Sequence, residues 1–354
     1  MQLRDLAAGL AARGHRVLVL TRPSARWTAE AETGGFAHHG RFRAAADPVG
    51  AARLAALLRA ERIQVVHAHK GGGRSLTLLA RLFGAAPPLV VNRGVSFPLS
   101  LTGRWLDGSP LVARVVAVCE AIRSDLIRQG IPPDKVEVVY SGTDTDRFDP
   151  AGADGRRIRA ELGLGPAPPL VIQVGVREPK GNDDVVRAFG RVRAVRPEAR
   201  LLLVGARTEK RKVLEDLAAG LGLGGAVTIW GYRDDIPDIL AAADVAVDAS
   251  YAGHGITGAL RESLAMETPV VATNTAGNPE LVRHEVTGLL VPPRDPAALA
   301  TAVLRLLGDP AWARSLGGAG RRLVAERFST RAKLGRLEAL YRTLAESQNS
   351  EFRP

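Results

Sequence analysis

Cysteine is nearly absent from this chain of 354 residues, which contains Cys119 alone. A disulfide within the chain is therefore excluded, and the sequence offers no cysteine cluster for a metal. Cys119 falls in an apolar run, which indicates a buried structural thiol. Hydrophobic residues make up 46% and charged residues 24%, which is typical of a globular protein and not of a disordered one. The length allows two domains of ordinary size.

Long hydrophobic runs are missing as well. No apolar stretch approaches the ~20 residues that a membrane-spanning helix needs. The best candidate, residues 111–119, is interrupted by Arg114. The first residues do not combine a charged region with an apolar core, so the sequence predicts no signal peptide. These patterns favour the cytoplasm. We find no internal repeat and no low-complexity segment.

Aromatic residues are scarce, at 5%, while the net charge is +11. Residues 1–150 carry 20 Lys+Arg against 13 Asp+Glu, and residues 151–354 carry 28 against 24, so the basic excess lies mainly in the first part. Nucleic acid is not favoured as a partner, because no patch interleaves aromatic and basic residues. An anionic membrane surface or a phosphorylated lipid acceptor fits the charge. An Arg- and Ala-rich composition with solvated charges fits it equally well.

Short apolar runs alternate with amphipathic segments along both halves of the chain. The first half predicts helices over 1–13, 47–62, 75–83 and 120–130, and strands over 16–21, 63–69, 114–119 and 136–140. It also predicts a strand that ends in a loop over 89–98 and an irregular stretch over 24–47. The second half predicts helices over 156–162, 208–220, 236–243, 296–307, 310–326 and 329–344, and strands over 169–175, 200–205, 227–230, 243–247 and 268–272. Residues 149–155 are rich in Pro, Gly and Asp and read as the linker. This alternation in two halves predicts two Rossmann-like domains.

Residues 244–283 carry the strongest functional signal. An apolar strand leads into a loop with Gly253 and Gly255, which allow a tight turn and close backbone approach. From Ile256 the apolar residues fall four apart, so one helical face looks inward. A glycine loop that opens onto a helix N-terminus leaves unpaired N–H groups and a positive dipole end, which suits a phosphate. Glu262 lies about two turns into that helix and could reach a sugar or ribose hydroxyl.

This stretch resembles the signature segment of the retaining glycosyltransferases of family 4, which have the GT-B fold. In that family a Glu, seven residues and a second Glu precede a Pro-Val-Val-Ala-Thr strand. Here Glu262 stands at the second Glu, His254 at the first, and residues 269–273 at the strand. The resemblance implies that Glu262 holds the nucleotide ribose and that His254 faces the donor sugar. It further implies a diphosphate held by N–H groups near Gly255, Ile256, Thr257 and Gly258.

The strand over 169–175 ends at Gly175 and is followed by Arg177 and Lys180. By the resemblance, these two cations clamp the donor diphosphate. The physics agrees, because two cations at a strand end can neutralise a diphosphate and then stabilise a leaving nucleotide. We therefore predict Arg177, Lys180 and His254 as the catalytic residues. The resemblance also puts the loop after residue 230 beside the nucleotide base, through Tyr232 and Arg233.

A second set of polar residues follows strands of the first half. His69, Lys70 and Gly72 lie where the strand over 63–69 runs into a glycine loop, and ligands of open α/β sheets bind at such carboxyl ends. Arg93 lies in the next strand-and-loop segment, residues 89–98. In some family 4 members a similar strand carries an Arg before a Phe-Pro turn on the acceptor side. We predict that these residues face the acceptor. For Arg93 two interpretations stay open, an anionic acceptor bound by its guanidinium group or a solvated surface arginine. His67 and His69 alternate on the strand, which predicts one toward the core and one toward the cleft, and a metal pair lacks a third ligand nearby.

The start of the chain departs from the family pattern. Residues 1–21 read as a helix, Ala-Arg-Gly-His and a strand, whereas family members place an initial strand and a Gly-Gly loop before this helix. In a doubly wound sheet the first strand is central, and its loss would expose strand edges. We therefore expect either a sequence truncated at its N-terminus or a partner that fills the gap.

These observations predict an α/β protein of GT-B architecture, with two Rossmann-like domains facing across a cleft and the first apparently lacking its first strand. The expected divisions are an acceptor-side domain over 1–149, a nucleotide-sugar domain over 150–328, a helix crossing back over 329–346 and a loose tail over 347–354.

The predicted function is that of a retaining, metal-independent glycosyltransferase of bacterial surface polysaccharide or glycolipid synthesis. It would be cytoplasmic or peripheral on the inner face of the plasma membrane. The substrates would be a UDP- or GDP-sugar and a glycan or lipid-linked acceptor, with no other cofactor. The alternative is a catalytically impaired nucleotide-sugar-binding protein, which His254 and the missing strand favour.

Overall fold

The computed structural model describes residues 2–21, 36–39, 47–95, 98–253 and 255–351. The chain divides into two compact units: unit 1 comprises Met1–Gly142 and Thr330–Pro354, and unit 2 comprises Thr143–Ser329. The first division therefore falls at residue 142, seven residues before the expected one. The Pro/Gly/Asp-rich stretch read as a linker belongs to unit 2, where Pro150–Gly152 form a 3₁₀ turn.

Unit 2 is built on a six-stranded, wholly parallel sheet with the order β12-β11-β10-β7-β8-β9. Its strands are β7 (Leu170–Val174), β8 (Arg200–Val204), β9 (Val227–Trp230), β10 (Val245–Asp248), β11 (Val270–Thr273) and β12 (Leu289–Val291). The chain fills one half of the sheet with β7–β9 and the other half with β10–β12. The strand order therefore reverses between β7 and β10, so that the chain continues from these two neighbouring strands into opposite halves of the sheet.

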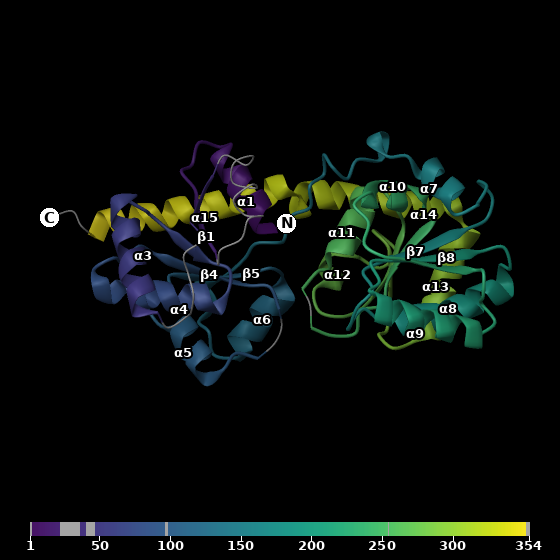
Figure 1. Cartoon of the computed structure of the whole chain (residues 1–354), viewed down its shortest axis with the longest axis horizontal. Helices are drawn as coiled ribbons and strands as arrows, with labels where there is room; N and C mark the ends of the chain where they lie inside the picture. The colour runs from purple at the N-terminus through teal and green to yellow at the C-terminus, as the bar shows by residue number, and fades with distance from the viewer. Residues whose placement is uncertain (1, 22–35, 40–46, 96–97, 254, 352–354) are drawn as a thin grey trace. The chain divides into compact units, whose positions relative to one another are not determined.

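Two layers of helices cover this sheet because its strands are apolar on both faces. Val171, Leu201 and Leu203 pack with α8 (Asn182–Val195), α9 (Thr208–Gly220) and α13 (Pro296–Gly308). The alternate residues Ile172 and Leu202 pack with α7 (Gly155–Glu161) and α10 (Ile236–Ala242) on the other face (Figure 1).

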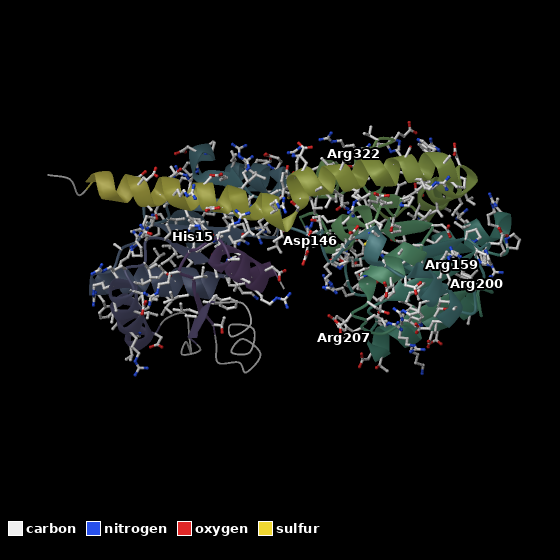
Figure 2. All side chains as sticks on the ribbon, turned by 90° about the horizontal axis from the view of Figure 1, so that it is seen from above. His15, Asp146, Arg159, Arg200, Arg207 and Arg322 are labelled. Atoms are coloured by element: carbon white, nitrogen blue, oxygen red, sulfur yellow. The ribbon has the colours of Figure 1, made fainter. Side chains whose placement is uncertain are left out.

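Side chains mark the two ends of this sheet. Figure 2 shows Arg159 and Arg200 together at the amino ends of β7 and β8, apart from Arg207, which follows the carboxyl end of β8.

Unit 1 contains a parallel pair, β1 (Leu18–Leu20) with β2 (Ala37–His39), and a separate four-stranded parallel sheet. The strands of that sheet follow chain order: β3 (Val66–Ala68), β4 (Leu89–Arg93), β5 (Arg114–Ala117) and β6 (Val136–Val138). One apolar cluster joins β4, β5 and the residue after β6 to α1 (Gln2–Ala11) and α15 (Thr330–Glu351). A second joins α3 (Pro48–Ala60) to α4 (Gly71–Ala80). The described residues of unit 1 also form η1 (Arg81–Phe83), α5 (Leu101–Gly108), α6 (Glu120–Arg128) and η2 (Pro133–Lys135).

The predicted α/β architecture with parallel sheets is confirmed, three local predictions are corrected, and one helix, α5, lies where no element was predicted. Gly72 lies in the first turn of α4 and not in a loop, because the N–H groups of Gly73 and Arg74 donate to the carbonyl of Lys70. β2 lies within the stretch predicted to be irregular, and α5 was not predicted. α15 continues to Glu351, so residues 347–351 are helical and not a loose tail. This last segment has no apolar periodicity, but its residues are compatible with a helix.

Within the described residues, no helix combines the length and apolar character needed to cross a membrane.

The helix that carries Glu262, α11 (Gly258–Ala265), is held by close packing against α14 (Pro310–Leu323). A Cβ atom on Gly317 would lie 2.0 Å from the carbonyl oxygen of Glu267, just beyond the end of α11. A Cβ atom on Gly320 would lie 2.4 Å from Cδ2 of Leu264. At these two positions α14 lies too close to α11 and to the residues that follow it for any residue larger than glycine. Two further short elements complete unit 2: α12 (Asn278–Leu281) and the π-helical turn Val324–Phe328.

We predict that Gly317→Ala destabilises the protein by about 1–3 kcal/mol, because the new methyl group must displace backbone. The neighbouring Gly318→Ala is the matched control. Its Cβ atom would meet only Nη1 of Arg322, at 3.7 Å, and alanine is the better helix former by about 1 kcal/mol. Thermal unfolding midpoints of both variants check the prediction. Equal midpoints would contradict the proposed packing of α14 on α11.

Candidate active site

The strand-order reversal in unit 2 brings two loops together beyond the carboxyl ends of β7 and β10. The first loop begins at Gly175 (φ +97°) and ends at Gly181 (φ +62°), both in the left-handed region. A Cβ atom on Gly181 would lie 2.2 Å from the carbonyl oxygen of Ala249 in the second loop. Only glycine fits such a contact, so the two loops meet backbone to backbone. In open α/β sheets, ligands bind at this position.

A buried ion pair connects the two loops. Nζ of Lys180 lies 2.6 Å from Oδ2 of Asp248, and the two residues are 4% and 1% exposed. Oδ1 of Asp248 accepts from the backbone N–H of Ser250 at 3.1 Å. The hydroxyl of Thr257 donates to Oδ2 at 3.0 Å. One carboxylate therefore fixes both the Lys180 ammonium and Thr257, the residue directly before the next helix.

The charge state of Asp248 follows from these contacts. Burial by itself raises the pKa of an acid, but the Lys180 ammonium and the hydrogen bonds of Ser250 outweigh it and hold the pKa of Asp248 below its ordinary value. The carboxylate is thus ionised and balances Lys180. We did not predict Asp248 from the sequence. The available signal was a carboxylate at the end of an apolar strand, where an unpaired charge would be costly.

Glu262 differs from Asp248 because its carboxylate has no hydrogen-bond partner among the described residues. The helix that carries it begins at Gly258, two residues later than predicted, and Thr257 caps it by accepting from the N–H of Leu260. A Cβ atom on Gly258 would lie 3.6 Å from Oε1 of Glu262, so this glycine leaves space beside the carboxylate. Burial raises the pKa of Glu262 and outweighs the opposing effects of Arg261, Arg147 and Lys180. The carboxylate oxygens are free to accept hydrogen bonds from a ligand.

Arg261 holds the loop that precedes α11 through two side-chain hydrogen bonds. Its Nη1 donates to the carbonyl of Ile256 at 3.0 Å and its Nε to the hydroxyl of Thr143 at 3.2 Å. Burial lowers the pKa of Arg261 to about 10, with Glu262 opposing the shift. The side chain of Ile256 is itself buried. Ile256 can therefore serve a ligand only through its backbone.

The predicted residues on the neighbouring loops fall into two groups. Arg177 is exposed, and its guanidinium forms no ion pair with a carboxylate in the described ranges. Tyr232 is 79% exposed. Arg233, by contrast, is bound by Glu161 and Asp235 and lies over the ring of Trp230 at 4.5 Å. Hydrogen bonds to these carboxylates hold the pKa of Arg233 above its ordinary value, so the guanidinium stays protonated. The two carboxylates already balance its positive charge.

The structure thus assembles Gly175, Lys180, Thr257, Gly258 and Glu262 at one place in unit 2. Gly175 belongs to it because its Cβ position lies 3.6 Å from Cε of Lys180. Gly255 lies on the loop before Thr257 and is buried. His254 lies outside the described residues. Among the described residues, no group of three or more His, Cys, Asp and Glu could hold a metal ion.

On unit 1, His67 and His69 lie on the same side of β3, which corrects the prediction that they face opposite ways. Their rings stack with centroids 4.3 Å apart, since residues two apart on a strand share a face. Nδ1 of His67 lies 2.6 Å from the hydroxyl of Tyr341. Burial lowers the pKa of both histidines, to about 4 for His69, and the charge of Lys333 adds to the effect. Both imidazoles are neutral at physiological pH.

The other predicted acceptor-side residues lie around the ends of β3 and β4. Lys70 is exposed and precedes α4 without capping it. Arg93, at the end of β4, has its pKa lowered by burial, while Asp107 opposes the shift and Arg74 adds to it. Asp107 is fully buried, and its Oδ1 accepts from Nη1 of Arg74 at 2.6 Å. Two guanidinium groups, those of Arg74 and Arg93, therefore lie near one buried carboxylate. The sequence reading missed Arg74 and Asp107.

Two family profiles match this chain in succession. That of "Glycosyltransferase Family 4" covers residues 1–147, and that of "Glycosyl transferases group 1" covers residues 168–309. The GDP-mannose-dependent alpha-(1-6)-phosphatidylinositol monomannoside mannosyltransferase of Mycobacterium tuberculosis is 32% identical over 276 residues, which cover 73% of this chain and 71% of that protein. The chain belongs to the family 4 glycosyltransferases.

Coverage of other family 4 relatives is smaller. The alpha-maltose-1-phosphate synthase of Mycobacterium tuberculosis is 32% identical over 246 residues, which cover 64% of this chain and 62% of the synthase. The chain therefore spans somewhat less than two thirds of that relative's length.

Solved structures establish the fold of this family 4 chain as GT-B. A glycosyltransferase from Rickettsia africae superposes with a TM-score of 0.89 at 21% identity, covering 96% of this chain and 93% of that one. Anabaena HepE, solved in complex with UDP-glucose, superposes with a TM-score of 0.80 at 22% identity, covering 98% and 94%. The predicted family and fold are both confirmed.

We predict that Glu262→Gln raises the stability of the ligand-free protein at neutral and higher pH. An acid whose pKa is raised on folding contributes stability below its unfolded pKa, and that stability is lost as pH rises through the folded pKa. Glutamine removes the ionised form, so the variant should unfold at a higher temperature than the native protein at pH 8. The difference should shrink toward pH 4.

Thermal unfolding midpoints across this pH range make the measurement. Asp216→Asn, which removes an exposed carboxylate from α9, is the matched control and should track the native protein. A Glu262→Gln variant less stable than the native protein at pH 8 would show that the carboxylate has a partner in the folded chain.

Proposed function

We propose that this chain is a retaining, metal-independent glycosyltransferase that moves a sugar from a nucleoside diphosphate to a glycan or lipid-linked acceptor. The observation that carries the proposal is the arrangement of Lys180 and Glu262 where the strand order of unit 2 reverses. A cation beside the start of a helix suits a diphosphate. A carboxylate without a partner suits the hydroxyl groups of a ribose. The membership of the chain in family 4 supports the same conclusion.

In this proposal Arg177, Lys180 and the N–H groups of residues 255–258 hold the diphosphate and stabilise the charge that develops as it leaves. Glu262 accepts hydrogen bonds from the ribose, and His254 faces the sugar. Retention follows a single-face displacement. The bond between the anomeric carbon and the phosphate oxygen breaks, the bond to the acceptor oxygen forms on the same face, and the acceptor's proton passes to the departing phosphate. No cofactor other than the donor takes part.

The acceptor side of the proposal rests on unit 1. His69, Lys70, Gly72 and Arg93 face the acceptor, and the guanidinium group of Arg93 suits an anionic one. We place the product among bacterial surface polysaccharides or glycolipids and the enzyme in the cytoplasm or on the inner face of the membrane. The mycobacterial relative named above acts, by its name, on a phosphatidylinositol mannoside with GDP-mannose, and HepE was solved with UDP-glucose. Both nucleotides are therefore the first to test.

Calorimetric titration of GDP, UDP and inorganic pyrophosphate separates the two parts of the site. Arg177→Gln should weaken nucleoside diphosphate and pyrophosphate alike, by roughly 10- to 100-fold, because it removes a charge-assisted contact to phosphate. Glu262→Gln should weaken the nucleoside diphosphate and leave pyrophosphate unchanged, since only the ribose offers hydroxyl donors. Arg187→Gln, an exposed position on α8, is the charge-matched control. Unchanged binding in both test variants would remove these residues from the site.

Turnover distinguishes the enzyme from a binding protein. Donor hydrolysis and transfer should accompany nucleotide-sugar binding, and the anomeric configuration of the product, read by NMR, should equal that of the donor. An inverted product contradicts the single-face mechanism. Tight binding with neither hydrolysis nor transfer would instead support the catalytically impaired protein.

A further inference from the structure

A cavity of about 730 Å³ opens in unit 1 at the end of the sheet opposite to the predicted acceptor residues. Its wall includes Pro88 and Ala113, the residues directly before β4 and β5, and Ile63, which precedes β3. His69 and Arg93 follow the carboxyl ends of β3 and β4. The full length of the strands therefore separates this cavity from them, and nothing in the proposed transfer reaction uses it.

Three arginines and no carboxylate contribute to the cavity wall. They are Arg59 at the end of α3, Arg62 just after it, and Arg81 at the start of η1. Within the described chain, none of the three forms an ion pair. Arg59 donates to the carbonyl of Phe83, and Arg81 donates to the carbonyl of Pro87 at 3.4 Å. These bonds anchor the side chains and leave most of their five N–H donors unused.

Arg81 shows why an anion would be favourable here. Its Nε is buried and has no hydrogen-bond partner. Burial also lowers the pKa of Arg81, as expected for a guanidinium that loses water without gaining a counter-ion. An acceptor-rich anion in the cavity would satisfy the buried N–H and compensate the charge, and arginine is well suited to phosphate oxygens.

Apart from Ser347, the rest of the cavity wall carries no polar side chain. Leu58, Ile63 and Leu344 line it together with the alanines and prolines of residues 85–88. On η1, beside Arg81, Leu82 is 79% and Phe83 41% exposed. A bare inorganic ion would leave this apolar surface in water, whereas an apolar group attached to the phosphate would cover it.

We propose that this arginine pocket (Arg59, Arg62, Arg81 and the apolar wall of Leu58, Ile63 and Leu344) binds a phosphate ester of an apolar group, such as an isoprenyl or acyl-chain phosphate. The ligand's phosphate pairs with the guanidinium groups, and its hydrocarbon part lies on the apolar wall. The same chemistry belongs to a soluble amphiphile and to the headgroup end of a membrane lipid. The pocket is independent of the nucleotide site of unit 2.

The test titrates n-octyl phosphate, inorganic phosphate and n-octyl glucoside into the full chain by calorimetry, with GDP or UDP present to fill the nucleotide site of unit 2. The amphiphiles are kept below the concentrations at which they form micelles. Octyl phosphate should bind at least about tenfold more tightly than the probe with phosphate alone and than the probe with the octyl chain alone. The double variant Arg59→Gln/Arg81→Gln should lose about tenfold or more of that affinity. Arg53→Gln, which removes the same charge from an exposed position of α3 outside the pocket, should bind like the native protein.

The proposal would be overturned if octyl phosphate bound equally to the native and the double-variant proteins. It would also be overturned if the native protein bound octyl glucoside as tightly as octyl phosphate. If the double variant does not fold, Arg62→Asn and Arg81→Lys replace it. Asparagine tolerates the left-handed backbone of Arg62 (φ 47°), and lysine keeps the charge at residue 81 but not the forked donor geometry. Both should weaken octyl phosphate binding, and unchanged binding in both would equally overturn the proposal.

Sedimentation with phosphatidylcholine vesicles, with and without phosphatidate, separates the two sources of the ligand. Phosphatidate-dependent binding that the double variant loses and Arg53→Gln keeps identifies a membrane headgroup. Octyl phosphate binding without vesicle binding identifies a soluble ester. Vesicle binding lost as much in Arg53→Gln as in the double variant would reveal general surface charge and would overturn the pocket.

Discussion

The buried ion pair between Lys180 and Asp248 is the interaction on which the site of unit 2 depends. Two opposite charges are stable in the interior only when they are paired and hydrogen-bonded, so neither side chain can leave the other without a large penalty. That constraint fixes the loop after β7 against the loop after β10, at the point where the strand order reverses. Gly181 permits the close approach of the two backbones, and Thr257 extends the network to the cap of α11.

Around this balanced pair the protein keeps charges that are not balanced. Glu262 is an acceptor without a partner among the described residues, and Arg177 is a cation without a carboxylate there. Each lowers the stability of the empty protein or leaves it unchanged, and each becomes favourable when a ligand supplies the complementary group. Such a trade of stability against function is expected where a binding site is preorganised. Arg233 differs from these two residues, because it already forms ion pairs with Glu161 and Asp235 and so stabilises the local structure.

The sequence predicted those parts of the molecule that local patterns determine. The bounds of α9 and β9 agree with prediction to the residue, because their periodicity and flanking glycines are unambiguous. Glu262 was located through a helix and a family motif. Asp248 was not, because its role depends on Lys180, which lies 68 residues away in sequence, and only the fold brings them together. The three glycines of α4 read as a loop because glycine has low helix propensity, yet a helix begins there.

The central claim is that Lys180 faces Asp248 on one side and the diphosphate of the donor on the other. The most direct test is the stabilisation that GDP or UDP gives to Asp248→Asn, compared with the native protein. Asparagine leaves a buried ammonium without its counter-ion, so the empty variant should unfold at a markedly lower temperature. A bound diphosphate would supply the missing negative charge, and the ligand-induced rise in unfolding temperature should therefore be larger in the variant than in the native protein. An equal or smaller rise would contradict the claim and make the pair purely structural.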